Sequence, residues 1–229
     1  MTTAPHFTVA DSAKDPDAEL WFAEPAGFRA IPLDGLLPTS GSPTADHLRA
    51  ALAPFLDAAP DKMMRRQFIA QLAQGQELLG ALCEIGTVHC SIGLHRDDID
   101  EAADSSGQPL LSFFTLSWRD TAVAPRAVTA ARAVSSAQGH TRIEYLELPC
   151  GPATLSETEL TPSVDSGLPQ TPLLQIHAHL PHPDCKRLVV LTLSTTAGAR
   201  REHYRAILRQ IAELVCFDNP LDLDRRVAR

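Results

Sequence analysis

The chain has 229 residues, of which 44% are hydrophobic, and its formal net charge is -8 at pH 7. This length suffices for one sizeable hydrophobic core or two small ones. Acidic residues outnumber basic ones 28 to 20 without a dense cluster of lysine and arginine, which argues against nucleic acid and anionic membranes as partners, because both are bound through basic surfaces.

Other features of the composition predict a cytoplasmic protein. No window approaches the roughly 18 consecutive apolar residues of a transmembrane helix, so we expect no membrane insertion. The N-terminal residues lack a basic start followed by an apolar stretch, so we expect no secretory signal. Five cysteines are spread along the chain without a C-x-x-C pair, a pattern typical of reduced thiols.

In chain order, we expect a loose segment at 1–20, a single domain at 21–220 and a tail at 221–229, because no linker divides the apolar segments. Within the first half of the domain, the patterns predict a strand at 28–33, helices at 44–56 and 60–86, and strands at 87–95 and 110–118. The alternation along 87–95 places Val88 and Cys90 on a core face, and His89 and His95 on a polar face.

The second half predicts a helix at 125–139, strands at 142–148, 153–160, 173–180 and 187–196, and a helix at 201–217. The strand at 187–196 is apolar on both faces and should be central in its sheet. Short turns between consecutive strands favour antiparallel pairing. We therefore predict an α+β layered sandwich, in which helices pack on the faces of a largely antiparallel sheet of six or seven strands.

The opening PAGFRAIPL, a helix before the sheet, the hairpin that ends in LVVLTLSTT and the closing YRAILRQIAELVCF together resemble the PsbP-like fold. Its members include the photosystem II extrinsic subunit, the yeast Ran nucleotide-release factor and actinobacterial relatives of mycobacterial lipoproteins. The resemblance covers about half of the chain at the level of pattern. It implies an accessory or partner-binding role and carries no catalytic motif.

A candidate metal site lies where the strand at 173–180 meets its turn. His177 and His179 are two residues apart and share a strand face, and the turn is predicted to bring His182 or Cys185 towards them. Zinc takes such nitrogen and sulfur donors tetrahedrally. The alternative is that these histidines have only a structural role on a face that meets solvent.

Two further groups are candidates for interaction. His89, His95 and Gln175 are predicted to lie on the polar face of the sheet. A turn-rich acidic loop after His95 is a candidate interaction loop, and it lacks the alternating pattern of a calcium loop. The acidic residues of this loop are Asp97, Asp98, Asp100 and Glu101.

Nucleophilic and phosphate-binding chemistry have thinner support. Cys150 in a tight turn, or Cys185 beside His182, is a candidate thiol nucleophile, although an unactivated thiol is the ordinary case. Ser194, Thr195 and Thr196 precede the last helix and suggest either a phosphate cradle or simple helix capping.

The first functional hypothesis is a non-enzymatic, cytoplasmic accessory protein that presents a sheet edge or the acidic loop to another protein and needs no cofactor. The second is a metal-binding protein or metal-dependent enzyme that uses zinc or a similar ion at His177, His179 and His182. A homodimer formed through an edge strand is a further possibility, because exposed edges invite pairing.

Overall fold

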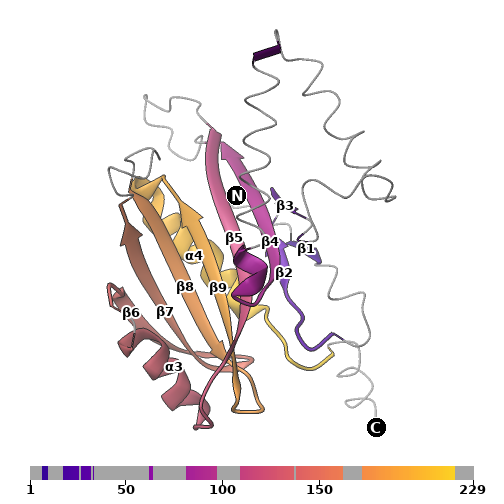
Figure 1. The fold of residues 1–229 in the computed structure, drawn as a ribbon, viewed down its shortest axis with the longest axis vertical. Helices are drawn as coiled ribbons and strands as arrows, with labels where there is room; N and C mark the ends of the chain where they lie inside the picture. Colours follow the sequence, from indigo (N-terminus) through magenta and orange to yellow (C-terminus); the bar gives the residue numbers. More distant parts are fainter. Residues whose placement is uncertain are drawn as a thin grey trace, which may run out of the picture.

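The computed structural model describes residues 7–9, 18–25, 27–31, 33, 62–63, 81–96, 109–136, 138–161 and 172–219. Seven strands form one antiparallel sheet in the order β3-β4-β5-β9-β8-β7-β6 (Figure 1). These strands are β3 (Phe28–Ala30), β4 (Thr87–Arg96), β5 (Pro109–Asp120), β6 (Thr141–Leu148), β7 (Gly151–Leu160), β8 (Leu173–Pro181) and β9 (Arg187–Thr195). The predicted α+β fold with a largely antiparallel sheet is confirmed, and β9 is its central strand.

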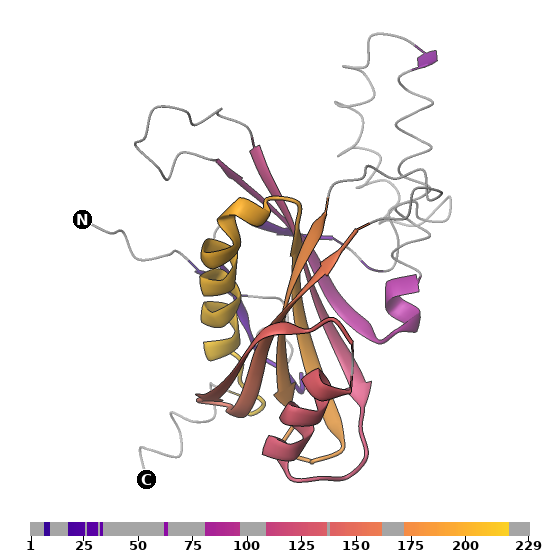
Figure 2. The same cartoon turned by 90° about the vertical axis from the view of Figure 1, so that its left-hand side faces the viewer.

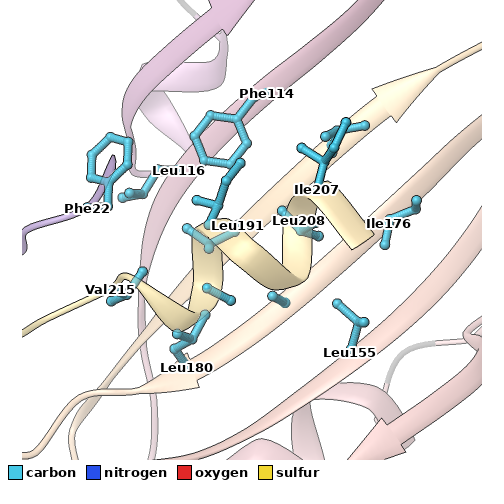
Figure 3. Packing of buried hydrophobic residues seen from close by; sticks show 14 of the residues in the cluster. Phe22, Phe114, Leu116, Leu155, Ile176, Leu180, Leu191, Ile207, Leu208 and Val215 are labelled. Atoms are coloured by element: carbon cyan, nitrogen blue, oxygen red, sulfur yellow. The ribbon is translucent and has the colours of Figure 1, made fainter. Parts of the chain in front are cut away.

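Helix α4 (Arg201–Glu213) covers one face of the sheet, which we call the α4 face. Its apolar stripe at Tyr204, Ile207, Leu208 and Ile211 has the spacings of three and four that place side chains on one side of a helix. Figure 3 shows Ile207 and Leu208 above apolar side chains of the strands. The fully buried strand residues of this core are Phe114, Leu116, Leu155, Ile176, Leu180, Val189, Leu191 and Leu193.

Helix α3 (Arg126–Ser135) lies on the opposite face of the sheet (Figure 2). It buries Ala130 and Val134 and is also held through polar contacts. The Thr154 hydroxyl donates to the Ala130 carbonyl at 3.2 Å, and Arg126 Nε donates to the Pro181 carbonyl at 2.9 Å. A second nitrogen of Arg126 donates to the carbonyl of Cys150, so this side chain ties α3 to the ends of two hairpins. Gly151, at φ +118°, leaves room for the guanidinium, which a Cβ would strike.

The turn between β8 and β9 is built around Asp184. Its carboxylate accepts hydrogen bonds from the backbone N–H groups of Lys186 at 2.8 Å and Arg187 at 3.1 Å. Cys185 adopts a positive φ of 62° within the turn. An aspartate that accepts hydrogen bonds from the N–H groups two and three residues later stabilises a turn, as the P-H-P-D sequence predicts.

The N-terminal segment differs from expectation. Strand β1 (Phe7–Val9) pairs with β2 (Ala23–Pro25) in a separate two-stranded sheet, whereas the polar composition predicted a loose segment at 1–20. Trp21 exchanges backbone hydrogen bonds with Cys216 at 2.8 Å, which joins this segment to the chain after α4.

Several expected features fall partly or wholly outside the described residues. Residues 62–63 and 81–84 are helical, in agreement with part of the helix expected at 60–86, while the helix at 44–56 and the tail at 221–229 lie beyond the described ranges. None of the helices that the structure describes combines the length and apolarity needed to cross a bilayer.

Candidate functional site

Strand pairing lines up polar side chains across the face opposite α4, which we call the cavity face. His177 of β8 lies between Thr192 of β9 and Ser156 of β7. Because directly paired residues of an antiparallel sheet share a face, these side chains project together. Two residues further along β8, His179 pairs directly with Thr154 of β7 on the same face.

A cavity of about 700 Å³ opens on this face. Its floor is formed by β5, β7, β8 and β9, one wall by α3 and the turn after it, and another by Leu82 and Ile85. The polar side chains that line it include Thr115, Ser117, Arg119, Arg132, His140, Thr158, Gln175, His177, His179 and Thr192. A concave site with converging polar groups is the usual form of a small-molecule site.

Three imidazoles gather at the cavity. The ring centroid of His140 lies 5.3 Å from that of His177 and 5.6 Å from that of His179, and the last two are 6.0 Å apart. His140 comes from the segment between α3 and β6, so strands and turn contribute jointly. The cluster therefore exists only in the folded sheet.

The hydrogen bonds of the three rings differ. Both nitrogens of His177 have hydroxyl partners, with Nε2 at 2.9 Å from Thr158 Oγ1 and Nδ1 at 3.0 Å from Thr192 Oγ1. His140 Nδ1 lies 2.9 Å from the Ser156 hydroxyl. His179 is only 6% exposed, and its Nδ1 has no hydrogen-bond partner among the residues that the structure describes. The nitrogen is itself buried, so its missing partner is a cost to the fold and not a contact point open to the cavity.

Burial keeps the imidazoles of the cluster neutral. Desolvation, with smaller contributions from the charges of His140 and Arg119, lowers the pKa of His177 to about 4. Desolvation together with neighbouring His177, His140 and Arg119 lowers the pKa of His179 to about 3, and burial also lowers the pKa of His140. At neutral pH the rings accept or donate hydrogen bonds without carrying charge.

The fixed positive charge of the cavity comes from Arg119 and Arg132. Both side chains line it, and neither forms an ion pair with any residue in the described part of the chain. The acid in the lining, Glu159, pairs with Arg201 of α4. The cavity is therefore lined by two exposed guanidinium groups that have no carboxylate partner in the described part of the chain, whose net charge over all 229 residues is -8.

The predicted set of four metal ligands is not brought together, which corrects the expected role of the turn. His177 and His179 project into the cavity. His182 projects from the other face, where its ring centroid lies 5.5 Å from that of Trp118 and 4.9 Å from that of Phe217. Cys185 stays in the turn, with its thiol 3.6 Å from the Pro183 carbonyl.

The parity of the strand explains this separation, since residues at even and odd positions point to opposite sides of the sheet. Among the residues that the structure describes, no group of three or more histidine, cysteine, aspartate or glutamate side chains is arranged to hold a metal ion. The four predicted ligands His177, His179, His182 and Cys185 are thus not gathered around one point.

The predicted polar face of His89, His95 and Gln175 is also corrected. Gln175 lies on the cavity face and donates to Ser194 Oγ at 3.2 Å. His89 instead points to the α4 face, where its ring packs near Phe114 and its Nε2 lies 2.9 Å from Glu24 Oε1. The side chain of His95 and the loop with Asp97, Asp98, Asp100 and Glu101 lie outside the described residues.

The other chemical candidates gain no support from their surroundings. Burial raises the pKa of the Cys150 thiol, whereas an activated nucleophile needs a lowered one. Ser194, Thr195 and Thr196 do not cap α4, which begins after a short 3-10 turn at Gly198–Arg200 and has no side-chain cap. The Thr195 hydroxyl instead accepts from the Ala197 N–H at 3.1 Å.

Sequence reasoning missed Arg119, Arg132 and His140, because no local motif marks them. One available signal was the alternation of hydroxyl residues within β5, β7 and β9. It places Thr115 and Ser117, Thr154 and Ser156, and Thr192 and Ser194 at positions that share one face of the sheet.

Comparison of the chain with family models, with curated proteins and with solved structures finds no match. The resemblance to the PsbP-like fold stays a prediction.

Proposed function

We propose that this protein is a binding protein that holds a small molecule in the cavity on the face of the sheet opposite α4. The observation that carries the proposal is a cavity of about 700 Å³ on which the imidazoles of His140, His177 and His179 converge with hydroxyl groups of three strands. A concave surface on which a few polar groups converge is the usual form of a small-molecule site.

The surrounding contacts support binding rather than structural packing. Hydroxyl groups on three strands and the Gln175 amide offer donors and acceptors at fixed positions, because antiparallel pairing sets their spacing. The neutral imidazoles add sites that can act as donor or acceptor. A pure core would place apolar residues at these positions, as the opposite face of the same strands does.

A second candidate function is the one predicted from the sequence, in which an edge of the sheet binds another protein or a second copy of this chain. The edge strand supports this function less well than the cavity supports small-molecule binding. In edge strand β6, the pairing register with β7 shifts between Thr141 and Glu144, and Arg142 adopts a positive φ of 49°. Such irregularities hinder the addition of a further strand.

We place the protein in the cytoplasm as part of this proposal. All five cysteines, including the exposed Cys83, are free thiols. Unpaired cysteines of this kind fit a reducing compartment.

The test is an NMR titration of protein labelled with nitrogen-15 in its histidine rings. Pools of sugars, polyols, amino acids, nucleosides and organic acids are added in turn. We expect one pool to shift the ring signals of His140, His177 and His179, while exposed His203 on α4 does not respond and serves as the internal control. If no pool moves the three signals, or if His203 moves equally, the proposal fails.

A further inference from the structure

The chemistry of the cavity face changes steadily along the strands. In β5, alternate residues on this face run from Leu111 and Phe113 through Thr115 and Ser117 to Arg119. An apolar end, a hydroxyl-lined middle and a cationic end therefore follow one another on a single strand.

The same gradient recurs in β8 beside it. Leu173 stands at the apolar end, Gln175 follows, and His177 and His179 lie towards the cationic end. Leu173 pairs directly with Leu160 of β7, whose side chain is 50% exposed. At about 3.4 Å per residue, Leu173 and His179 are roughly 20 Å apart along the strand.

A second hollow of about 320 Å³ covers the apolar end. Leu111, Phe113 and Leu173 line it, and none of its described lining residues is charged. Four residues, Leu82, Thr115, Gln175 and Thr192, line both hollows, so the two form one continuous trough. Leu111 is 55% exposed there, so apolar surface at this end of the trough is open to a bound molecule.

We propose that the trough binds an organic anion that carries one apolar tail, with the anionic head at Arg119 and Arg132 and the tail along Leu111, Phe113 and Leu173. This inference rests on the proposed function and specifies its ligand class. The two guanidinium groups are exposed and lack carboxylate partners in the described part of the chain, so they are available to pair with the head.

The neutral state of His177 and His179 suits this arrangement. Together with Thr192 and Ser117, they form an uncharged polar section between the apolar end and the cationic end, so the positive charge of the trough stays at Arg119 and Arg132. Glu159 is the acid in the cavity lining, and its pairing with Arg201 removes its repulsion for an anion.

Calorimetric titration with four single compounds tests both halves of the ligand. These are octanoate, octyl phosphate, butanoate and 1-octanol, each below its micelle concentration. We expect octanoate or octyl phosphate to bind at least tenfold more tightly than butanoate, because each buried methylene contributes about fourfold in affinity. We expect 1-octanol also to bind at least tenfold more weakly, because it lacks the charge. The stronger of the two anions identifies the head as carboxylate or phosphate.

Matched variants locate the two ends. Arg119→Gln is expected to weaken octanoate about tenfold and to leave 1-octanol unchanged, while Arg29→Gln, an exposed arginine on β3 outside the trough lining, has no effect. Leu111→Ser is expected to abolish the advantage of octanoate over butanoate. Val123→Ser, 73% exposed and outside both linings, preserves it.

Each contrary outcome has a distinct meaning. Equal affinity for butanoate and octanoate overturns the tail, and equal affinity for 1-octanol and octanoate overturns the anionic head. Binding that leaves the ring signals of His177 and His179 unmoved places the ligand elsewhere and overturns the inference. If none of the four compounds binds while another pool shifts those signals, the inference fails and the proposed function stands. If nothing shifts them, both fail.

Discussion

Alternate residues of the same strands build the two faces of this sheet from different chemistry. On β9, Leu191 and Leu193 are fully buried beneath α4, whereas Thr192 between them faces the cavity and contacts His177. The α4 face is held together by apolar burial, which is strong and needs no directional partner. The cavity face keeps some apolar burial, at Leu188 and Val190, but polar side chains occupy most of the positions that apolar ones fill on the α4 face.

Charges differ between the faces as well. At the edge of the α4 face, Glu157 is 1% exposed and lies 2.8 Å from Arg205 Nη1. On the cavity face, Arg119 and Arg132 have no carboxylate partner among the described residues. The buried charges of the α4 face are thus used in an ion pair, whereas the exposed guanidinium groups of the cavity are available to a ligand.

The largest expected effect separates two neighbouring residues of β9. Leu191→Ala should lower the free energy of unfolding by about 3 to 4 kcal/mol, because it empties space in a fully buried core. Thr192→Ala should cost about 1 kcal/mol or less, since His177 can exchange the lost hydroxyl for water in the cavity. Urea unfolding of both variants measures the difference, and equal losses would contradict the assignment of the two faces.

The second effect concerns the buried ion pair. Glu157→Gln should destabilise the protein by about 3 kcal/mol, because it leaves the buried charge of Arg205 less compensated. Glu144 still accepts from Arg205 at 3.1 Å and limits the loss. Glu159→Gln, at a carboxylate whose side chain is 56% exposed, should cost less than 1 kcal/mol. If Glu157→Gln lowers the free energy of unfolding no more than Glu159→Gln does, the buried ion pair stabilises the protein no more than the exposed one.

The α4 face was largely predictable from sequence, because its signals are local. The stripe of Tyr204, Ile207 and Leu208 follows helical spacing, and the alternation in β8 assigns Ile176 to the core. Strand β4 is the exception. A register shift lies between Thr87 and His89, and Glu24, distant in the sequence, supplies the partner that lets His89 and Ser91 point inward.

The cavity face was not predictable in the same way. Its members His140, Arg119 and Thr158 come from three segments that are adjacent only through strand order, and strand order depends on long-range pairing. The H-x-H pattern of His177 and His179 identified part of the site. It did not predict that His182 lies on the opposite face. The alternation of side chains continues to the end of β8 at Pro181, so an even-numbered residue such as His182 points away from His177 and His179.

The third effect is a pH dependence that belongs to the cavity face. The pKa of His177 is lowered to about 4 and that of His179 to about 3, whereas an unfolded histidine titrates near 6.5. Below pH 6.5 these two histidines bind protons in the unfolded chain but stay neutral in the folded chain. The free energy of unfolding therefore falls as the pH drops from about 6.5 towards 4. Each ring contributes at most about 1.4 kcal/mol per pH unit in this window.

Denaturant unfolding between pH 7 and pH 5 measures this slope. His179→Gln should reduce this slope by the contribution of one ring, at most about 1.4 kcal/mol per pH unit. His203→Gln, at an exposed position on α4, should leave the slope unchanged. The neighbouring charges of Arg119, Arg132, His140 and Glu159 are the same in all three proteins, so the difference reports the substituted ring. An unchanged slope in His179→Gln would show that this ring is not held neutral by burial.

The smallest effect tests how α3 is attached. The Thr154 hydroxyl donates to the Ala130 carbonyl inside the interface between β7 and α3, and both residues are buried. Thr154→Val keeps the shape of the side chain and removes the donor, so we expect a loss of about 1 kcal/mol. Hydrogen exchange should then quicken for the amides of α3 and stay unchanged for those of α4, because apolar burial holds α4 in place. Equal acceleration in both helices would mean that the two faces unfold as one unit, and that the hydrogen-bonded attachment of α3 has no separate stability.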